Sequence, residues 1–218
     1  MICGVDEAGR GPVIGPLVIA GVTFQNDIEL KENGVKDSKK LSASRRRVLA
    51  EKIKELADNF EVIKISAQDI DDMRRVMTLN EIEVNVFSKV IEKLKPDICY
   101  VDAADVKDER FGKDIQSKLA FKTTIISKHK ADEIYPIVGA ASIIAKTTRD
   151  YEISIIESEL RKKLDVPLGS GYPADPITQN FLNKWLIKFG RLPPNTRHSW
   201  KTSQKLLNNY KTKKLDSF

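Results

Sequence analysis

The sequence predicts an α/β fold, in which a sheet flanked by helices is followed by a helical C-terminal portion. Short β-branched runs alternate with stretches of helical periodicity over residues 1–164, and residues 165–218 hold helical patterns separated by turn-rich segments. The composition, 41% hydrophobic and 31% charged residues in a chain of 218, is typical of a soluble globular protein. We expect the division between the two portions in the loop between Leu164 and Asp175.

Strands and one helix are expected in the first part of the chain. Residues 1–5 form a short apolar strand, and residues 17–24 form a second, β-branched strand that follows Gly15-Pro16. Ser42 is a suitable N-cap for an amphipathic helix that reaches about residue 58, and residues 60–66 form a third strand. The first two strands are expected to pair as neighbours.

The middle of the chain continues the alternation. Thr78-Leu79-Asn80-Glu81 has the form of a capping box, which predicts a helix that begins there and ends near residue 94, before Pro96. Residues 98–102 and 121–127 are expected to be the fourth and fifth strands. Three helices should follow, over about residues 138–164, over a segment after Asp175 that contains Phe181 and Trp185, and over about residues 202–213.

Acidic residues stand at the expected ends of core elements. Asp6 and Glu7 follow the first strand, Asp102 ends the fourth, and Asp132 lies just ahead of the long helix. Carboxylate oxygens are the ligands that Mg²⁺ and Mn²⁺ prefer, and four carboxylates can hold two ions ~3.5–4 Å apart for phosphodiester hydrolysis. Acids at strand ends also serve as caps and turn formers, so spacing alone leaves both interpretations open.

The adjacent acids raise a geometric difficulty, because neighbours on a regular strand point to opposite faces. Asp6 and Glu7 could then not both reach one site unless the Gly9-Arg10-Gly11 segment kinks the chain. This segment also resembles the start of a dinucleotide-binding fingerprint, but its third glycine is Gly15 and a strand follows instead of a helix. The dinucleotide interpretation is therefore excluded. A tight turn would explain the glycines but not the arginine between them.

Charge and cysteine content narrow the function classes. Lys and Arg number 37 against 31 Asp and Glu, a net charge of +6 that favours a polyanionic partner if the excess gathers on one face. Cys3 and Cys99 lie in apolar runs, which indicates buried thiols in a reducing compartment. We expect a cytoplasmic protein without membrane association. His129 and His198 are isolated, and we place neither in the site.

Several motifs together carry a family resemblance over nearly the whole chain. In their order and spacing they resemble type 2 ribonuclease H, ribonuclease HII, of the single-domain archaeal kind. The matching segments are Gly4-Val5-Asp6-Glu7-Ala8-Gly9-Arg10-Gly11-Pro12, Asp37-Ser38-Lys39-Lys40-Leu41, Val101-Asp102, Lys130-Ala131-Asp132, Ala140-Ala141-Ser142-Ile143-Ile144-Ala145-Lys146, Gly169-Ser170-Gly171-Tyr172-Pro173 and Arg197-His198-Ser199-Trp200.

The resemblance implies a ribonuclease H-like mixed sheet and a metal-dependent endoribonuclease. Its four metal-binding acids would be Asp6, Glu7, Asp102 and Asp132, with Mg²⁺ or Mn²⁺, and possible use of Co²⁺. The implied activity is cleavage of the RNA strand of RNA/DNA hybrids and nicking on the 5′ side of single ribonucleotides in duplex DNA. The products would carry 3′-hydroxyl and 5′-phosphate ends, in ribonucleotide excision repair and DNA replication, and the protein would act as a monomer.

The resemblance also implies substrate-binding residues, and the C-terminal portion would complete the substrate cleft. Gly9, Arg10 and Gly11 would read the ribose 2′-hydroxyl, a group that is both donor and acceptor, and Tyr172 would pack on the adjoining deoxyribose. Lys39 and Lys40 would grip phosphates, and Lys146 would neutralise a phosphate or support the acids. The alternatives are an ordinary half-buried tyrosine and generic surface lysines.

The last residues, Leu215-Asp216-Ser217-Phe218, resemble the core of a sliding-clamp-binding peptide. The match is incomplete, because Thr212 stands where glutamine is usual and a second terminal aromatic is absent. Two other function classes stay open at this point. One is a basic nucleic-acid-binding module or clamp adaptor without hydrolysis, and the other is a different nuclease or transposase of the same superfamily.

Overall fold

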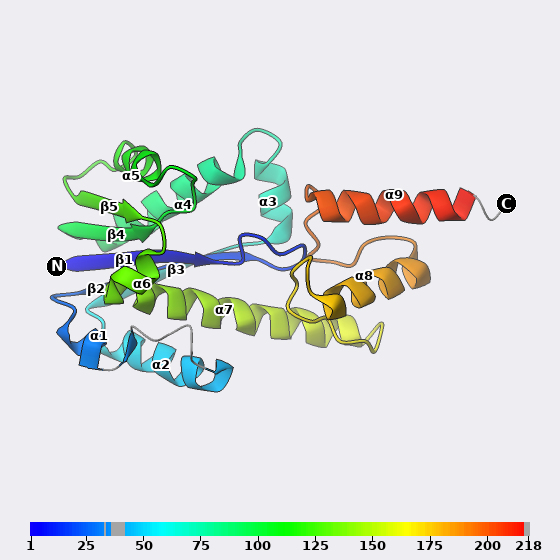
Figure 1. Ribbon diagram of the computed structural model, residues 1–218, viewed down its shortest axis with the longest axis horizontal. Helices are drawn as coiled ribbons and strands as arrows, with labels where there is room; N and C mark the ends of the chain where they lie inside the picture. Colours follow the sequence, from blue (N-terminus) through cyan, green and yellow to red (C-terminus); the bar gives the residue numbers. More distant parts are fainter. Residues whose placement is uncertain (33, 36–41, 216–218) are drawn as a thin grey trace. The chain divides into compact units, whose positions relative to one another are not determined.

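The computed structural model describes residues 1–32, 34–35 and 42–215 of the chain (Figure 1). It divides into two compact units. The sheet unit comprises Met1–Ala8, Val18–Lys64 and Met77–Thr148. The helical unit comprises Gly9–Leu17, Ile65–Val76 and Arg149–Phe218. The boundary expected from the sequence near residue 164 stays a prediction.

Among the residues described, the sheet unit contains five strands, in the order β3-β2-β1-β4-β5. Strand β1 is antiparallel to β2 and parallel to β4, and β4 is parallel to β5, so the sheet is mixed with β1 at its centre. The bounds are β1 (Ile2–Ala8), β2 (Leu17–Phe24), β3 (Asn59–Ile65), β4 (Ile98–Asp102) and β5 (Thr124–Lys128).

Helices cover both faces of this sheet, and Figure 1 shows α4 and α5 on one face with α1, α2 and the first part of α7 on the other. Gly21 on β2 packs against Val90 and Leu94 of α4. Gly4 on β1 packs on the backbone of α7, where an added Cβ would lie 2.2 Å from the Ile137 carbonyl oxygen. The helices are α1 (Ile28–Glu32), α2 (Ala43–Leu56), α4 (Leu79–Leu94), α5 (Asp108–Gln116), α6 (Ala131–Ile134) and α7 (Pro136–Arg161).

The helical unit contains α3 (Ala67–Met73), the end of α7, α8 (Pro176–Phe189) and α9 (Lys201–Leu215). Its core consists of apolar side chains from the loop before β2, from α7 and from α8. Val13, Ile14, Ile153, Phe181 and Trp185 are among them. Asp175 caps α8 by accepting a hydrogen bond from the Ile177 amide.

The predicted α/β class is confirmed, and so are the elements with clear local signals. Ser42 and Thr78 cap α2 and α4, with the full capping box at Thr78. The first strand is longer than expected, because its ladder with β2 continues through both acids to Ala8. The short helices α1, α3, α5 and α6 were not predicted. No helix in the described ranges is long and apolar enough to cross a membrane.

Candidate active site

Three carboxylates from three separate segments come together in the sheet unit. Asp6 lies on β1, Asp102 is the last residue of β4, and Asp132 lies on α6. One oxygen from each lies within 4.8 Å of the others. Two Mg²⁺–oxygen bonds of ~2.0–2.1 Å span about 4 Å, so small side-chain rotations would let all three bind one cation. The residues therefore fit a magnesium or manganese site.

Backbone pairing explains why these acids meet. The parallel ladder between β1 and β4 pairs Val5 with Val101, and Asp6 and Asp102 are the next residues on the two strands. Ala131 at the start of α6 donates its amide to Asp102 Oδ1 at 3.2 Å, which holds Asp132 beside the strand ends. The turn before α6 depends on Lys130, whose backbone is left-handed (φ 55°).

Helix α7 brings a positive charge to the acids. Lys146 Nζ lies 3.8 Å from Asp132 Oδ2, and Ser142 is one turn earlier on the same helix. Burial raises the pKa of Asp6 to about 7, with repulsion from Asp102 as the second cause and partial relief from Ser142, Lys146 and the Glu7 amide. That amide donates to Asp6 Oδ1 at 2.7 Å. The concentrated negative charge would be relieved by a bound cation.

Glu7 does not belong to this group of three. In the ladder with β2, Asp6 pairs with Ala20 and Glu7 with Ile19, so the two acids alternate across the sheet as on any regular strand. Gly4 faces α7, and Asp6, two residues further along β1, lies on the same face. The kink at Gly9 comes after Glu7 and does not change this alternation. A metal-binding role for Glu7 stays a proposal.

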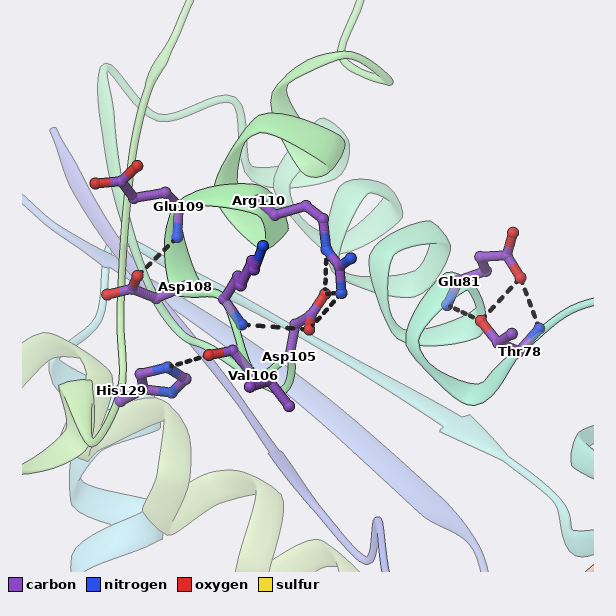
Figure 2. A network of polar contacts seen from close by, with 9 residues as sticks. Thr78, Glu81, Asp105, Val106, Asp108, Glu109, Arg110 and His129 are labelled. Atoms are coloured by element: carbon purple, nitrogen blue, oxygen red, sulfur yellow. Dashed lines mark hydrogen bonds and ion pairs between the residues drawn. The ribbon is translucent and has the colours of Figure 1, made fainter.

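Hydrogen bonds join the loop that follows Asp102 to the loop that precedes Asp132 (Figure 2). His129 Nε2 donates to the Val106 carbonyl at 3.1 Å, and Ala103 donates its amide to the Lys128 carbonyl at 3.0 Å. Within the segment after Asp102, the Asp105 carboxylate accepts three hydrogen bonds from Arg110, at 2.5, 2.7 and 2.8 Å. These contacts were not predicted, because nothing in the local sequence marks a pairing between two loops.

The glycine-rich turn lies in the helical unit and is held by a buried arginine. Gly9 has φ 88°, and a Cβ there would lie 2.5 Å from the Pro16 carbonyl oxygen, so only glycine fits. The fully buried Arg197 donates to the carbonyls of Gly9, Arg10 and Gly15 at 2.5, 2.9 and 3.1 Å. Trp200 Nε1 donates to the Gly11 carbonyl at 3.3 Å. The sequence motif containing Arg197 and Trp200 was noted, but this role was missed.

Tyr172 lies beside the same turn. A Cβ on Gly11 would be 3.7 Å from Tyr172 Cε1, and Tyr172 is 40% exposed. The Arg149 guanidinium sits 4.9 Å from the ring centroid and donates to the Ser170 carbonyl at 2.7 Å. The structure thus brings Gly9, Arg10, Gly11 and Tyr172 together. Lys39 and Lys40 lie outside the described residues.

The fold and the acid cluster define a class, the ribonuclease H-like nucleases. The family model described as Ribonuclease HII matches residues 3–203. A ribonuclease HII of Methanosarcina acetivorans is 49% identical over 216 residues, covering 94% of this chain and 95% of that protein.

Solved structures agree with the family match. The ribonuclease H2 of Pyrococcus horikoshii OT3 has a TM-score of 0.87 at 41% identity and covers 96% of this chain and 98% of that one. The ribonuclease HII in a complex with PCNA from Archaeoglobus fulgidus has a TM-score of 0.84 at 44% identity, covering 94% and 96%. The chain belongs to the ribonuclease HII family. It is a ribonuclease H endoribonuclease, and the resemblance inferred from the motifs is confirmed.

Proposed function

We propose that this enzyme cleaves the RNA strand of RNA/DNA hybrids and nicks duplex DNA on the 5′ side of single ribonucleotides, leaving 3′-hydroxyl and 5′-phosphate ends. The observation that carries the proposal is the convergence of Asp6, Asp102 and Asp132. A group of three acids, two of them buried, would repel a phosphate backbone unless cations intervene. A binding module without hydrolysis is therefore the weaker alternative.

We assign the divalent ions to Asp6, Asp102 and Asp132, with Glu7 as the fourth acid. These oxygen ligands suit Mg²⁺ or Mn²⁺, and Co²⁺ could substitute. Two such ions, when bound, would activate water and stabilise the leaving oxygen of the phosphodiester. Lys146, 3.8 Å from Asp132, balances part of the negative charge and would also neutralise a substrate phosphate.

The turn formed by Gly9, Arg10 and Gly11 would select the ribonucleotide, together with Tyr172. The 2′-hydroxyl is the group that distinguishes RNA from DNA, and backbone groups of a tight turn can approach it closely because glycine has no side chain. The exposed part of the Tyr172 ring offers an apolar surface to the next sugar. Lys39 and Lys40 would bind phosphates without regard to base sequence.

We also propose a sliding clamp as a partner. The structural relative from Archaeoglobus fulgidus is described in complex with PCNA. In this chain the candidate contact is residues 215–218, at the end of α9. Residues 216–218 lie outside the described residues, so the proposal depends on sequence and on the relative. Action as a monomer, a cytoplasmic location and roles in ribonucleotide repair and replication are proposed on the resemblance alone.

The test is a DNA duplex that carries one ribonucleotide at a defined position, incubated with the purified protein and Mg²⁺. We expect one nick on the 5′ side of the ribonucleotide, a 5′-phosphate on the downstream product, and no cleavage with excess chelator. An all-DNA duplex of the same sequence is the control. Failure to nick would favour the binding module, and cleavage of the all-DNA duplex would favour another nuclease of the superfamily.

A further inference from the structure

Two side chains hold four backbone carbonyls in the Gly9–Gly15 segment. Arg197 donates hydrogen bonds to the carbonyl oxygens of Gly9, Arg10 and Gly15, and Trp200 donates one to that of Gly11. The separation in sequence is 182 to 189 residues. One guanidinium therefore sets the direction of three peptide groups in the segment that we propose reads the ribose.

Because peptide groups are planar, these carbonyl directions also fix the directions of the backbone amides in the turn. In a planar trans peptide, the carbonyl of one residue and the amide of the next point in opposite directions. Because the carbonyls of Gly9 and Arg10 point at Arg197, the amides of Arg10 and Gly11 point away from it. The carbonyls of Gly11 and Gly15 precede Pro12 and Pro16, which have no amide hydrogen. The amides of the consecutive residues Arg10 and Gly11 therefore lie on the same side of the turn, away from Arg197.

We propose that Arg197, assisted by Trp200, is a positioning residue that makes this turn a hydrogen-bond donor surface for the 2′-oxygen of a ribonucleotide. The inference deepens the proposed function and rests on it. In such a site the 2′-oxygen accepts from the turn, and the deoxyribose of DNA offers no acceptor at this position. Two successive amides pointing the same way form a small anion- and oxygen-binding concavity.

Arginine suits this role better than any other side chain. Its planar guanidinium carries five donors in a fixed fork, whereas a lysine ammonium is a point charge on a flexible stem. The segment around it is itself anchored, because the Arg197 amide donates to the Val13 carbonyl at 2.8 Å. The Arg197 guanidinium also lies 4.8 Å from the Trp200 ring centroid.

The experiment compares Arg197→Lys with a matched control, Ser203→Ala. The control removes a buried hydrogen bond from the same segment but leaves the guanidinium intact. Both changes are made in the Asp102→Asn background so that bound duplexes stay uncut. The quantity measured is the ratio of dissociation constants for an all-DNA duplex and for the same duplex with one ribonucleotide, in Mg²⁺.

We expect Arg197→Lys to reduce this ratio by about tenfold or more, the factor that corresponds to ~1.4 kcal/mol. Its affinity for the all-DNA duplex should stay within about twofold, because the positive charge is kept. Ser203→Ala should keep the ratio. An unchanged ratio in a folded Arg197→Lys protein would overturn the proposal, and so would an equal loss in both variants.

If Arg197→Lys does not fold, Trp200→Phe decides the question. It removes the hydrogen bond to the Gly11 carbonyl and keeps an aromatic ring at this position, so the ratio should fall in the same direction by a smaller factor. An unchanged ratio in Trp200→Phe would overturn the proposal. The nicking assay on the unmodified protein tests the proposed function separately from the role of Arg197. A protein that nicks at the ribonucleotide supports the proposed function whatever the Arg197 result.

Discussion

Lys146 Nζ lies 3.8 Å from Asp132 Oδ2, so the acids of the candidate site already have a cation of the protein's own beside them. The Lys146 side chain is 35% exposed, which means that water screens part of its charge. Lys146 lowers the pKa of Asp6, against the larger effects of burial and Asp102. A metal ion entering the group must therefore tolerate a neighbouring ammonium.

Replacing Lys146 with methionine should strengthen Mn²⁺ binding by a factor of a few, because a competing positive charge is removed. The measurement is a calorimetric titration of the metal-free protein with Mn²⁺. Lys93→Met is the control, since Lys93 pairs with Glu61 on the surface of the same unit. Weaker Mn²⁺ binding in Lys146→Met would show that the lysine holds the acids in place instead of competing with the ion.

Asp102→Asn should reduce the nicking rate by at least ~10³-fold, because a metal ligand is lost while phosphate contacts persist. Duplex affinity, measured by fluorescence anisotropy, should change little. Asp97→Asn removes an equal charge from an exposed carboxylate that pairs with the N-terminal ammonium, and should nick at the normal rate. Normal nicking by Asp102→Asn would remove Asp102 from the site.

The raised pKa of Asp6, about 7, predicts how metal-free stability depends on pH. Between pH 3.8 and 7 the folded state keeps a proton that the unfolded state has lost, so the free energy of unfolding falls as pH rises through this window. Asp6→Asn removes this titration. The variant should gain stability relative to the parent as pH increases, by up to roughly 4 kcal/mol above pH 7 at ~1.36 kcal/mol per pKa unit.

Urea unfolding in chelator at pH 5 and pH 8 measures this difference. The stability gain of Asp6→Asn should be larger at pH 8 than at pH 5. A gain of equal size at both values would contradict a raised Asp6 pKa. Mn²⁺ binding to the parent protein should in turn weaken as pH falls below 7, because a proton then competes for Asp6.

Tyr172→Ala should raise the KM for a duplex with one ribonucleotide several-fold, because the ring beside Gly11 is lost, whereas Tyr172→Phe should behave almost as the parent. Steady-state nicking kinetics measure both. Tyr151, a 65% exposed aromatic on α7, supplies the control variant Tyr151→Ala. A normal KM in Tyr172→Ala would assign the tyrosine to packing alone.

Deleting residues 212–218 should weaken binding to an archaeal PCNA without changing the nicking rate on a short duplex. The physical reason is that the candidate clamp contact lies in a terminal segment, after most of α9. Surface plasmon resonance with immobilised clamp measures the affinity. Unchanged clamp affinity after the deletion would dismiss this segment as the contact.

Local signals were sufficient for much of the fold. The caps at Ser42 and Thr78 and the β-branched run at 17–24 each depend on residues a few positions apart, and the structure contains the elements they predict. Helix α3 has a capping box too, between Ser66 and Asp69, which a search for Ser-x-x-Asp would have found. Helix α5 begins at Asp108, and its N-cap residue Lys107 makes no side-chain cap hydrogen bond, so no capping signal existed.

The candidate site was harder to predict in its supporting contacts than in its acids. Asp102 could be placed at a strand end, and the closeness of Asp6 and Asp102 follows from the parallel pairing of β1 with β4. Asp132 joins them through the contact of the Ala131 amide with Asp102. The contacts of Arg197 with the turn join residues more than 180 positions apart, and no local pattern encodes them. The expected kink does not fall between Asp6 and Glu7, because the β1 ladder with β2 continues through both acids to Ala8.

The closeness of Gly4 to the Ile137 carbonyl has a bearing on how this protein tolerates change. Any side chain at position 4 would lift α7 from β1 and carry Ser142 and Lys146 with it, although position 4 itself has no chemistry to perform. The alignment of these polar groups on the helix thus depends on an absent methyl group, and mutational scanning should find this position as intolerant as the acids themselves.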